Sequence, residues 1–328
     1  MKRGELLVVS IEDVAKHAGV SIATVSRVLN RTGYVSEDTE LKVLKAVNEL
    51  DYKPHISART LARKKSQLVG IVMSKRIYEL LDKDIGKFYG IILDAIENNV
   101  MMYKMTSKRI VFEEEEVSGC DGYIILGSDM NEEEIEEISV RSKVVLVDHY
   151  IDGLRVDSVL SDGYDGVFYI TQKFIDNGFN KIVHLHGLLK YYGFRDRYTG
   201  YVAAMRKNGR LPVSIEYDEL HEEVDNVLKK ILRDNIPEVI VCSNDVIAIN
   251  VLRKLEEWGY RIPEEINVVG FDDIPNAERE GLSTLRVQKS ELGFNAVKRL
   301  YELLNNQSLH PYKQSIYTSY VKRSSTVI

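Results

Sequence analysis

Residues 10–30 read SIEDVAKHAGVSIATVSRVLN, and this stretch predicts two short helices joined by a tight turn. Ser10 precedes the first helix, where its hydroxyl can accept a hydrogen bond from the backbone N–H of Asp13. Gly19 stands where that helix must end, because glycine enters the left-handed region without a steric penalty. Ser21 then caps the second helix. A helix, a turn that contains glycine and a second helix together predict a helix-turn-helix.

A third helical pattern follows this pair. Ser36 is expected to cap it, and apolar residues recur along it at helical spacing. The residues expected to form its buried stripe are Leu41, Leu44, Val47 and Leu50. The region therefore predicts a small all-α domain of three helices.

The second helix carries the residues expected to read DNA. The N-terminal half of this helix enters the major groove in helix-turn-helix domains. Arg27 can donate two hydrogen bonds to guanine, and the nearby hydroxyl groups suit phosphate oxygens. Ile22 and Ala23 can offer only apolar contact, for example to thymine methyl groups. The candidate DNA-contacting residues of this region are Ser10, Ser21, Ile22, Ala23, Thr24, Ser26, Arg27 and Asn30.

The charge of the chain is divided unevenly between this region and the rest. Residues 1–66 contain twelve Lys and Arg against eight Asp and Glu, which gives a net charge of +4. The whole chain carries −6, so the remaining residues carry −10. A basic N-terminal region on an acidic body indicates a nucleic-acid footprint at one end. The charge favours this interpretation over a three-helix domain that binds no DNA.

The string from Asp13 to Asn30 resembles the DNA-binding signature of the lactose/galactose repressor family, LacI/GalR. Residues 52–61, YKPHISARTL, resemble the hinge of that family. The resemblance covers essentially the whole chain. It implies a helix-turn-helix domain at residues 1–54, a hinge at 55–66 and an effector-binding and dimerisation domain at 67–328.

The hinge has the composition of a short helix. Pro54 stops the preceding segment, Ser57 can cap a helix, and Ala58 and Leu61 share one face of it. The resemblance implies that the hinge helices of a dimer lie in the minor groove, where Leu61 wedges between base pairs and kinks the duplex. A basic linker with Leu61 exposed is the alternative. His55 stands where the family commonly has asparagine, which leaves the start of the helix open.

Beyond residue 66, apolar β-branched runs alternate with amphipathic helical patterns. This alternation predicts a parallel sheet covered on both faces, and about 260 residues suggest two such units. The candidate strands are residues 68–73, 122–126, 144–147, 181–185, 239–242 and 267–270. The candidate helices are residues 87–98, 132–140, 164–177, 195–208, 222–233, 246–258 and 290–304. The expected fold is therefore an all-α head followed by an α/β body.

The resemblance implies that this body is a two-lobed, doubly wound, periplasmic-binding-protein-like domain. The first lobe would contain about residues 67–158 and 288–317, and the second about 159–287 and 318–328. The chain would cross between the lobes near residues 157–160, 286–288 and 315–321.

Polar residues follow several of the predicted strands. Ligands of open α/β sheets bind beyond the carboxyl ends of the strands. Carboxylate, amide and guanidinium groups there, beside aromatic residues such as Tyr191, Tyr192 and Tyr198, suit the hydroxyl groups and ring faces of a sugar. By resemblance, Arg197, Asn244 and Asp272 fall on effector-contacting positions. The whole candidate effector-binding set is Asp148, Ser161, Arg197, Asn244, Phe271 and Asp272.

Each of these residues also has a structural alternative. Asn244 could cap the helix that follows it. Arg197 could pair with Asp196 on the surface.

The first lobe is short, since only sixteen residues separate Met105 from Gly122. This shortening, together with Ile22 and Ala23, resembles the branch that regulates galactose or β-galactosidase genes. The acidic run at residues 113–116 is expected to be a solvated helix face rather than a metal site.

Several classes of protein lack support in the sequence. There is no P-loop lysine, no GxSxG and no HExxH, so we expect no enzyme, cofactor or metal. Cys120 and Cys242 are isolated, and His184 and His186 are expected to point in opposite directions from one strand. With no apolar span and no signal peptide, we expect a cytoplasmic protein without a membrane partner.

The leading hypothesis is a sequence-specific transcriptional repressor that binds palindromic operator DNA as a homodimer. Its operator affinity would be controlled by a small sugar, with galactose or a galactoside favoured. A protein or purine corepressor is the second hypothesis, and a sugar-binding transport component or an enzyme is the third. Four residues of the helix at 290–304 could face a dimer partner or pack on their own lobe, namely Leu292, Ala296, Leu300 and Leu303.

Overall fold

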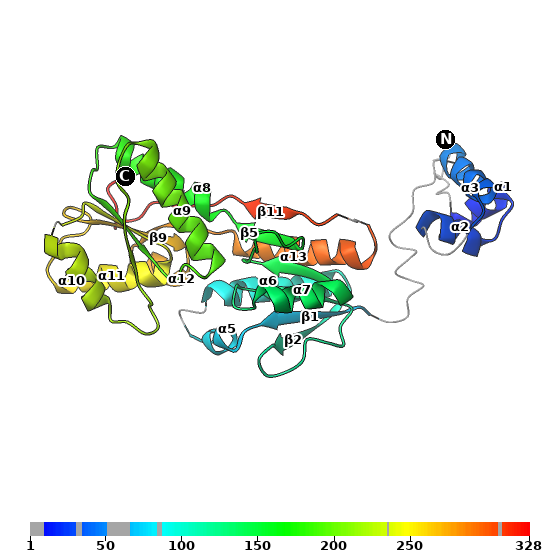
Figure 1. Cartoon of the computed structure of the whole chain (residues 1–328), viewed down its shortest axis with the longest axis horizontal. Coiled ribbons are helices and arrows are strands. Elements are labelled where there is room, and N and C mark those ends of the chain that lie inside the picture. The colour runs from blue at the N-terminus through cyan, green and yellow to red at the C-terminus, as the bar shows by residue number, and fades with distance from the viewer. Residues whose placement is uncertain (1–9, 31–34, 51–65, 84–86, 235, 308–309) are drawn as a thin grey trace, which may run out of the picture. The chain divides into compact units, whose positions relative to one another are not determined.

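The computed structural model describes residues 10–30, 35–50, 66–83, 87–234, 236–307 and 310–328 (Figure 1). It contains two compact units, Met1–Lys65 and Ser66–Ile328. The predicted hinge helix, with Ala58 and Leu61, lies outside the described residues. The fold class expected from the sequence, a helix-turn-helix unit followed by a body of parallel sheets, is confirmed.

The first unit contains α1 (Ile11–Ala18), α2 (Ile22–Asn30) and α3 (Glu37–Glu49). Ser10 caps α1 as expected: its hydroxyl accepts from the Asp13 backbone N–H at 3.2 Å, and the Asp13 carboxylate accepts from the Ser10 backbone at 2.9 Å. Gly19 ends α1 with a φ of 67°. The core between the three helices consists of Val14, Ala15, Val25, Val28, Val43 and Ala46.

The predicted buried face of α3 was wrong. Leu41 and Leu44 are 67% and 43% exposed, whereas Val43 and Ala46 are buried. Both faces of this helix carry apolar residues, so spacing alone did not identify the buried one. The Ser36 hydroxyl lies 2.9 Å from the Thr39 hydroxyl and makes no hydrogen bond that caps the α3 backbone.

The first sheet of the body is parallel throughout. Its strands lie in the order β11-β5-β4-β3-β1-β2. Their bounds are β1 (Leu68–Met73), β2 (Thr106–Val111), β3 (Gly122–Leu126), β4 (Lys143–Val147), β5 (Asp157–Ser161) and β11 (Lys313–Ile316).

The second sheet repeats this arrangement in the order β12-β10-β9-β8-β6-β7. All its pairs are parallel except β10 with β12. The bounds are β6 (Ile182–His186), β7 (Val213–Glu216), β8 (Val239–Cys242), β9 (Asn267–Asp272), β10 (Ser283–Arg286) and β12 (Ser319–Val321).

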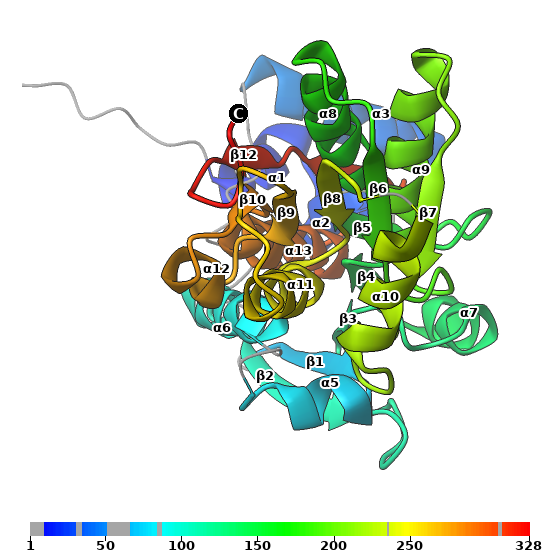
Figure 2. The same ribbon diagram turned by 90° about the vertical axis from the view of Figure 1, so that its left-hand side faces the viewer.

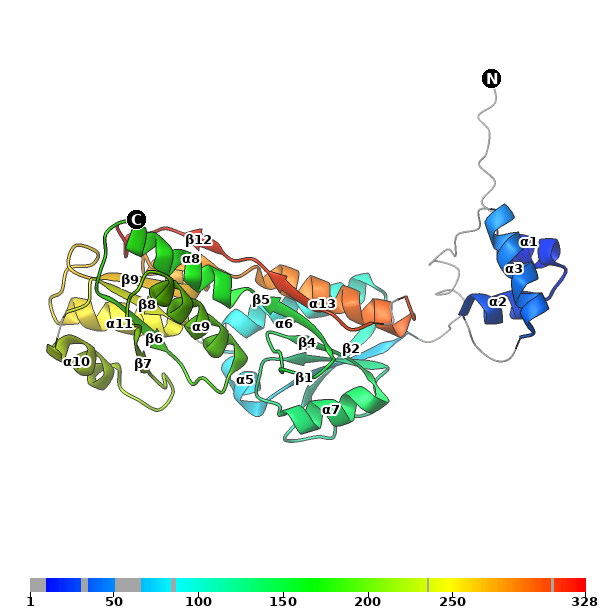
Figure 3. The same cartoon turned by 45° about the horizontal axis from the view of Figure 1, so that its top comes forward.

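Helices cover both faces of each sheet. The first sheet carries α5 (Lys75–Leu80), α6 (Lys87–Met102), α7 (Glu132–Arg141) and α13 (Lys289–Leu304), with α6 and α13 packed on one face and α7 on the other. The second carries α8 (Gly163–Asp176), α9 (Tyr192–Lys207), α10 (Val224–Asp234), α11 (Asp245–Glu257) and α12 (Pro275–Arg279). Figures 2 and 3 show α8 and α9 on one side of that sheet and α11 on the other. We call these two halves of the body the first and second lobes.

The chain passes between the lobes at three places: after β5, between β10 and α13, and between β11 and β12. Because the lobes are tied by three adjacent segments, their facing edges are the carboxyl ends of the strands. This arrangement follows the doubly wound pattern in which ligands bind at that edge.

Two edge strands and two short helices were not predicted. β2 reads TSKRIV and exposes its first four residues, and β7 reads VSIE, so neither has the apolar run of a buried strand. The acidic residues 113–116 form a turn rather than the expected helix face, with Glu114 and Glu115 paired to Lys75 and Lys108.

The apolar stripe of α13 packs on its own lobe. Leu292, Ala296 and Leu300 are fully buried and Leu303 nearly so in the single chain. The stripe therefore gives no support to the expected dimer.

The expected orientation of two histidines was also wrong. The His184 and His186 rings lie 5.8 Å apart, because residues two apart on a strand share one face. His184 is buried, with Nδ1 2.8 Å from the Val241 carbonyl oxygen. Within the described ranges, no helix is long and apolar enough to cross a membrane.

Candidate functional site

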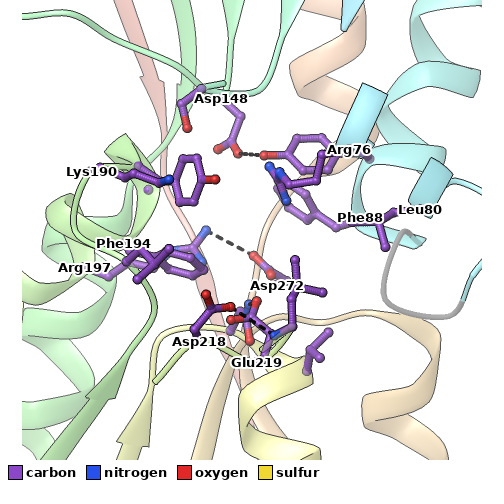
Figure 4. Close-up of a pocket in the computed structure, with 18 of the residues that line it drawn as sticks. Arg76, Leu80, Phe88, Asp148, Lys190, Phe194, Arg197, Asp218, Glu219 and Asp272 are labelled. Atoms are coloured by element: carbon purple, nitrogen blue, oxygen red, sulfur yellow. Dashed lines mark hydrogen bonds and ion pairs between the residues drawn. The ribbon is translucent and has the colours of Figure 1, made fainter. Parts of the chain in front are cut away.

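A cavity of about 230 Å³ lies between the two lobes, at the carboxyl ends of their strands (Figure 4). Both lobes line it, since α5, α6 and β4 supply one wall and α9, α11 and β9 the other. Its charged residues among those described are Arg76, Lys190, Arg197, Asp148, Asp218, Glu219 and Asp272. Its aromatic residues are Phe88, Tyr89, Tyr191 and Phe194.

The carboxylate of Asp148 faces the cavity from the end of β4. Its backbone has a φ of 56°, a left-handed conformation that turns the chain directly after the strand. The Tyr89 hydroxyl donates to one carboxylate oxygen at 3.2 Å, and the Ser161 hydroxyl donates to the other at 3.5 Å. Burial raises the pKa of Asp148 to about 6, because the charged form loses its water.

Arg197 and Asp272 form a buried ion pair at the opposite wall. Arg197 Nη2 donates to Asp272 Oδ1 at 3.1 Å, and Nη1 donates to the Ser243 carbonyl oxygen at 2.6 Å. The guanidinium carbon lies 3.8 Å from the centroid of the Phe271 ring. These contacts hold the guanidinium plane in one orientation. Its Nε is buried without a partner among the described residues.

The loop that carries Asp272 is held from behind. Asp272 has a φ of 111°, and Asp245 accepts hydrogen bonds from the Ile274 backbone N–H at 2.8 Å and from the Thr284 hydroxyl at 2.5 Å. Burial raises the pKa of Asp272, whereas Arg197 and Lys289 oppose the shift. The Lys289 ammonium donates to the backbone carbonyl of Asp272. The strained carboxylate is therefore fixed before any ligand arrives.

Asn244 caps a helix and lines the cavity at once. Its side-chain oxygen accepts from the Ile247 backbone N–H at 2.8 Å and so caps α11. Its amide nitrogen donates to Glu219 at 3.3 Å. Burial raises the pKa of Glu219. The capping role considered from the sequence is present, and the amide group remains at the cavity wall.

The structure separates the predicted effector residues into two groups. Asp148, Arg197, Asn244 and Asp272 line the cavity, whereas Ser161 and Phe271 stand behind it and support Asp148 and Arg197. Effector contact by the four lining residues stays a prediction.

The alternative of a surface pair between Arg197 and Asp196 was wrong. Arg197 is 4% exposed, and Asp196 accepts from the backbone N–H groups of Gly163 and Tyr164 at 3.1 and 2.9 Å. Of the three tyrosines predicted to flank the site, Tyr191 lines the cavity. Tyr198 instead packs against His186 in the second lobe.

Several lining residues were missed. Arg76 directly follows β1, so the strand-end rule would have found it; it forms two hydrogen bonds of 2.9 Å with Asp129, which also accepts from Ser74 at 2.8 Å. Tyr89 lies on a helix, and Asp218 and Glu219 lie in a loop after an edge strand. Nothing local in the sequence distinguishes these three residues. Only the approach of the two lobes brings them to the cavity.

The DNA-reading face of the first unit is exposed. Ser21, Ile22, Ala23 and Arg27 are exposed on α2, and Thr24 and Ser26 are half-buried, whereas Val25 and Val28 pack in the core. The Ser21 hydroxyl accepts from the Thr24 backbone N–H at 3.1 Å, as expected of a cap. Ser10 is occupied in capping α1. The side chain of Asn30 lies outside the described residues, and DNA contact by this set stays a prediction.

The sequence matches two family profiles. A profile described as bacterial regulatory proteins, lacI family, matches residues 10–55, and a periplasmic binding protein-like domain matches residues 171–326.

Curated relatives extend over nearly the whole chain. The HTH-type transcriptional repressor PurR of Vibrio vulnificus is 30% identical over 320 residues, which cover 91% of this chain and 92% of the relative. The ribose operon repressor of Halalkalibacterium halodurans is 29% identical over 327 residues, 97% of each chain.

Solved structures share the fold. The lac repressor dimer bound to operator and the anti-inducer ONPF superposes with a TM-score of 0.70 at 25% identity, over 98% of this chain and 99% of that one. A complex of the transcriptional regulator CelR with cellobiose gives a TM-score of 0.70 at 22% identity, over 97% and 99% of the two chains.

Proposed function

Because this chain belongs to the lacI family of bacterial regulatory proteins, we propose that its repressor activity is controlled by a small, neutral sugar bound in the cavity between the lobes. As a member of that family the chain is a DNA-binding transcriptional repressor with an effector domain rather than an enzyme.

The observation that carries the sugar proposal is the fixed Arg197–Asp272 pair facing Asp148 across an aromatic-lined cavity. A guanidinium group donates hydrogen bonds and carboxylates accept them, so together they satisfy hydroxyl groups that do both. A planar pair held by neighbouring groups suits two adjacent hydroxyls of a sugar ring. The aromatic residues can pack against the apolar C–H face of the same ring.

The charge of the lining argues against an anionic effector. Four carboxylates face three cations in the cavity. Arg197 and Arg76 are already paired with Asp272 and Asp129. A phosphorylated sugar would therefore meet a net repulsion, whereas a neutral ligand would meet none.

The identity of the sugar is narrower than this support. We keep galactose and galactosides as the first candidates, on the resemblance of the short first lobe and of Ile22 and Ala23. The named relatives are repressors called PurR and a ribose operon repressor, and one fold neighbour holds cellobiose, so none of them favours galactose. A purine is the alternative effector.

For the DNA side we propose a cytoplasmic homodimer that binds a palindromic operator. The solved lac repressor is a dimer on its operator, which supports this assembly. Arg27 would read a guanine, and Ile22 and Ala23 would make apolar contacts with bases.

Thermal stabilisation of the full chain tests the proposal. A ligand that binds only the folded state stabilises it by about 2.7 kcal/mol at one hundred times its dissociation constant. Galactose, lactose, ribose, cellobiose and two purine bases form the panel. We expect a shift with at least one sugar, lost in Arg197→Lys, which keeps the charge but loses the planar fork.

Arg206→Lys is the matched control, because Arg206 is an exposed residue near the end of the same helix. It should respond to the sugar as the unmodified chain does. A shift with a purine and with no sugar would reject the sugar proposal and leave repression itself untouched.

A further inference from the structure

A second cavity of about 640 Å³ adjoins the first. The two cavities share four lining residues: Arg76, Ser128, Lys190 and Tyr191. The first cavity holds only a small ligand, since sites for drug-sized molecules measure roughly 300–1,000 Å³. A ligand that reaches past these shared residues would have room on their far side.

We propose that the effector is a disaccharide or glycoside that spans both cavities, with one sugar ring in the first and its second unit in the other. This inference rests on the proposed sugar-controlled function. It adds the chemical class of the sugar and assigns a second subsite to the first lobe.

Aromatic residues give the second cavity a surface suited to a sugar ring. Tyr150 and Tyr192 lie edge to face with their centroids 5.9 Å apart, and Tyr191 forms part of the shared wall. The Lys313 ammonium lies 3.9 Å from the Tyr150 centroid and fixes that ring from the side. Tyrosine presents an apolar face with a polar tip, which matches the apolar C–H faces and polar rim of a pyranose.

His149 lines the same cavity with unsatisfied hydrogen-bonding groups. It is 7% exposed, and neither ring nitrogen has a partner in the described part of the chain. Burial lowers its pKa to about 4, so the imidazole is neutral and offers one donor and one acceptor. A hydroxyl group can satisfy either one. An orphaned buried polar group is costly, so a ligand hydroxyl that reaches this ring would recover that cost.

The charges of the second cavity favour a neutral unit there as well. The cations are Arg76, Lys190 and Arg195, and the carboxylates are Glu113, Asp129, Glu132 and Asp152. Asp129 holds Arg76 through two hydrogen bonds, and Arg195 lies 3.6 Å from Asp152. No surplus of cations awaits a phosphate, so an unmodified sugar unit or a neutral aglycone fits.

The Arg76–Asp129 pair also makes the shared wall firm. The Ser74 hydroxyl donates to Asp129 at 2.8 Å and its backbone begins α5, so the wall is tied to the end of β1. The Arg76 guanidinium lies 5.1 Å from the Tyr191 centroid, which joins the wall of the first lobe to that of the second. The boundary between the two subsites is therefore built before a ligand binds.

Calorimetric titration of the full chain with matched sugars tests the inference. The probes are galactose and glucose as monosaccharides and lactose, cellobiose and maltose as disaccharides. We expect at least one disaccharide to bind ten times more tightly than either monosaccharide. His149→Leu should weaken that disaccharide about tenfold, as expected for the loss of one hydrogen bond, and change monosaccharide binding less than twofold.

A pair of variants at Asp152 tests the space itself. The Asp152 side chain is 83% exposed and lines only the second cavity, so replacing it leaves the core intact. Asp152→Trp should narrow the cavity and weaken the disaccharide, whereas Asp152→Ala, the control, should not.

The outcomes separate this inference from the function on which it rests. Equal affinity for monosaccharides and disaccharides, unchanged in His149→Leu and Asp152→Trp, would overturn the two-cavity inference and leave a monosaccharide effector. Failure of every sugar to bind would overturn the sugar assignment and this inference with it.

Discussion

At the scale of single residues, the cavity is defined by carboxylates held in unfavourable positions. Asp148 and Asp272 both have a positive φ, and burial raises the pKa of both. Backbone strain of this kind persists only where the surroundings enforce it, and it is common at ligand sites. Each carboxylate is kept in place by neighbours that a free chain would not provide.

The Arg197–Asp272 pair should therefore be costly to break. Arg197→Met keeps much of the side-chain volume but leaves the buried Asp272 carboxylate without its cation. We expect the free energy of unfolding to fall by about 3–5 kcal/mol, as measured by urea denaturation. The double variant with Asp272→Asn should lose less than the single variant, because no buried charge then lacks a partner. A double variant as unstable as the single one would show that the guanidinium stabilises the lobe by packing alone.

Asp148 should make stability depend on pH. Its pKa rises from 3.8 in the unfolded chain to about 6 in the folded one, so the folded state holds a proton that the unfolded state releases. The stability that this group contributes is present below about pH 4 and is lost as the pH rises to about 6. The full loss is about 3 kcal/mol.

Asp148→Asn removes this ionisation, so its urea-unfolding free energy should exceed that of the unmodified chain more at pH 7 than at pH 4. Other buried acids, such as Asp245, are common to both proteins and cancel in the comparison. A difference that stays constant with pH would contradict the raised pKa of Asp148.

At the scale of elements, α3 shows how a helix with two apolar faces misleads a sequence reading. Spacing favoured Leu41 and Leu44, yet the small residues Val43 and Ala46 face α1 and α2. The first unit is so small that large side chains do not fit between its three helices. The exposed leucines are left on the surface of the unit.

This register predicts opposite effects for two neighbouring substitutions. Val43→Ala should destabilise the first unit by roughly 1.5–3 kcal/mol, because Val43 is fully buried. Leu41→Ala should cost less than about 0.5 kcal/mol, as is usual for surface positions. Amide hydrogen exchange of α1 and α2 in the full chain measures both changes. A larger effect for Leu41→Ala would restore the stripe predicted from spacing.

At the scale of the whole molecule, a ligand and DNA bind to different units of one chain. The cavity is formed by both lobes, so its occupancy can change the lobe positions to which the hinge segment connects. Coupling of two sites through one equilibrium is typically about 1–3 kcal/mol.

Leu61→Ala separates the two activities. Leu61 lies outside the described residues, and its role as a wedge in the minor groove is a prediction of the family resemblance. Removing an apolar wedge should weaken specific operator binding strongly, because the kinked duplex loses its support, and leave sugar affinity unchanged. Operator binding is measured by fluorescence anisotropy and sugar binding by calorimetry. Equal losses of both would place Leu61 in the folding of the chain rather than in DNA binding.

The sequence by itself determined the helix-turn-helix and the class of the body. Caps at Ser10 and Ser21, the turn at Gly19 and the alternation of strands with helices are local signals, and local backbone preferences suffice to produce them. It also placed Asp148, Asn244 and Asp272 at the cavity, because parallel strands bring their carboxyl ends to a common edge.

Only the tertiary structure decided which other residues join them. Tyr89, Glu219 and His149 come from a helix, a loop and a strand end far apart in sequence, and nothing local in their surroundings indicates a shared site. The same holds for the buried face of α3 and for the polar edge strands β2 and β7. These features depend on how two sheets and their helices pack, because contact between distant segments, rather than the preference of any one segment, determines which side chains lose water and which meet across a cavity.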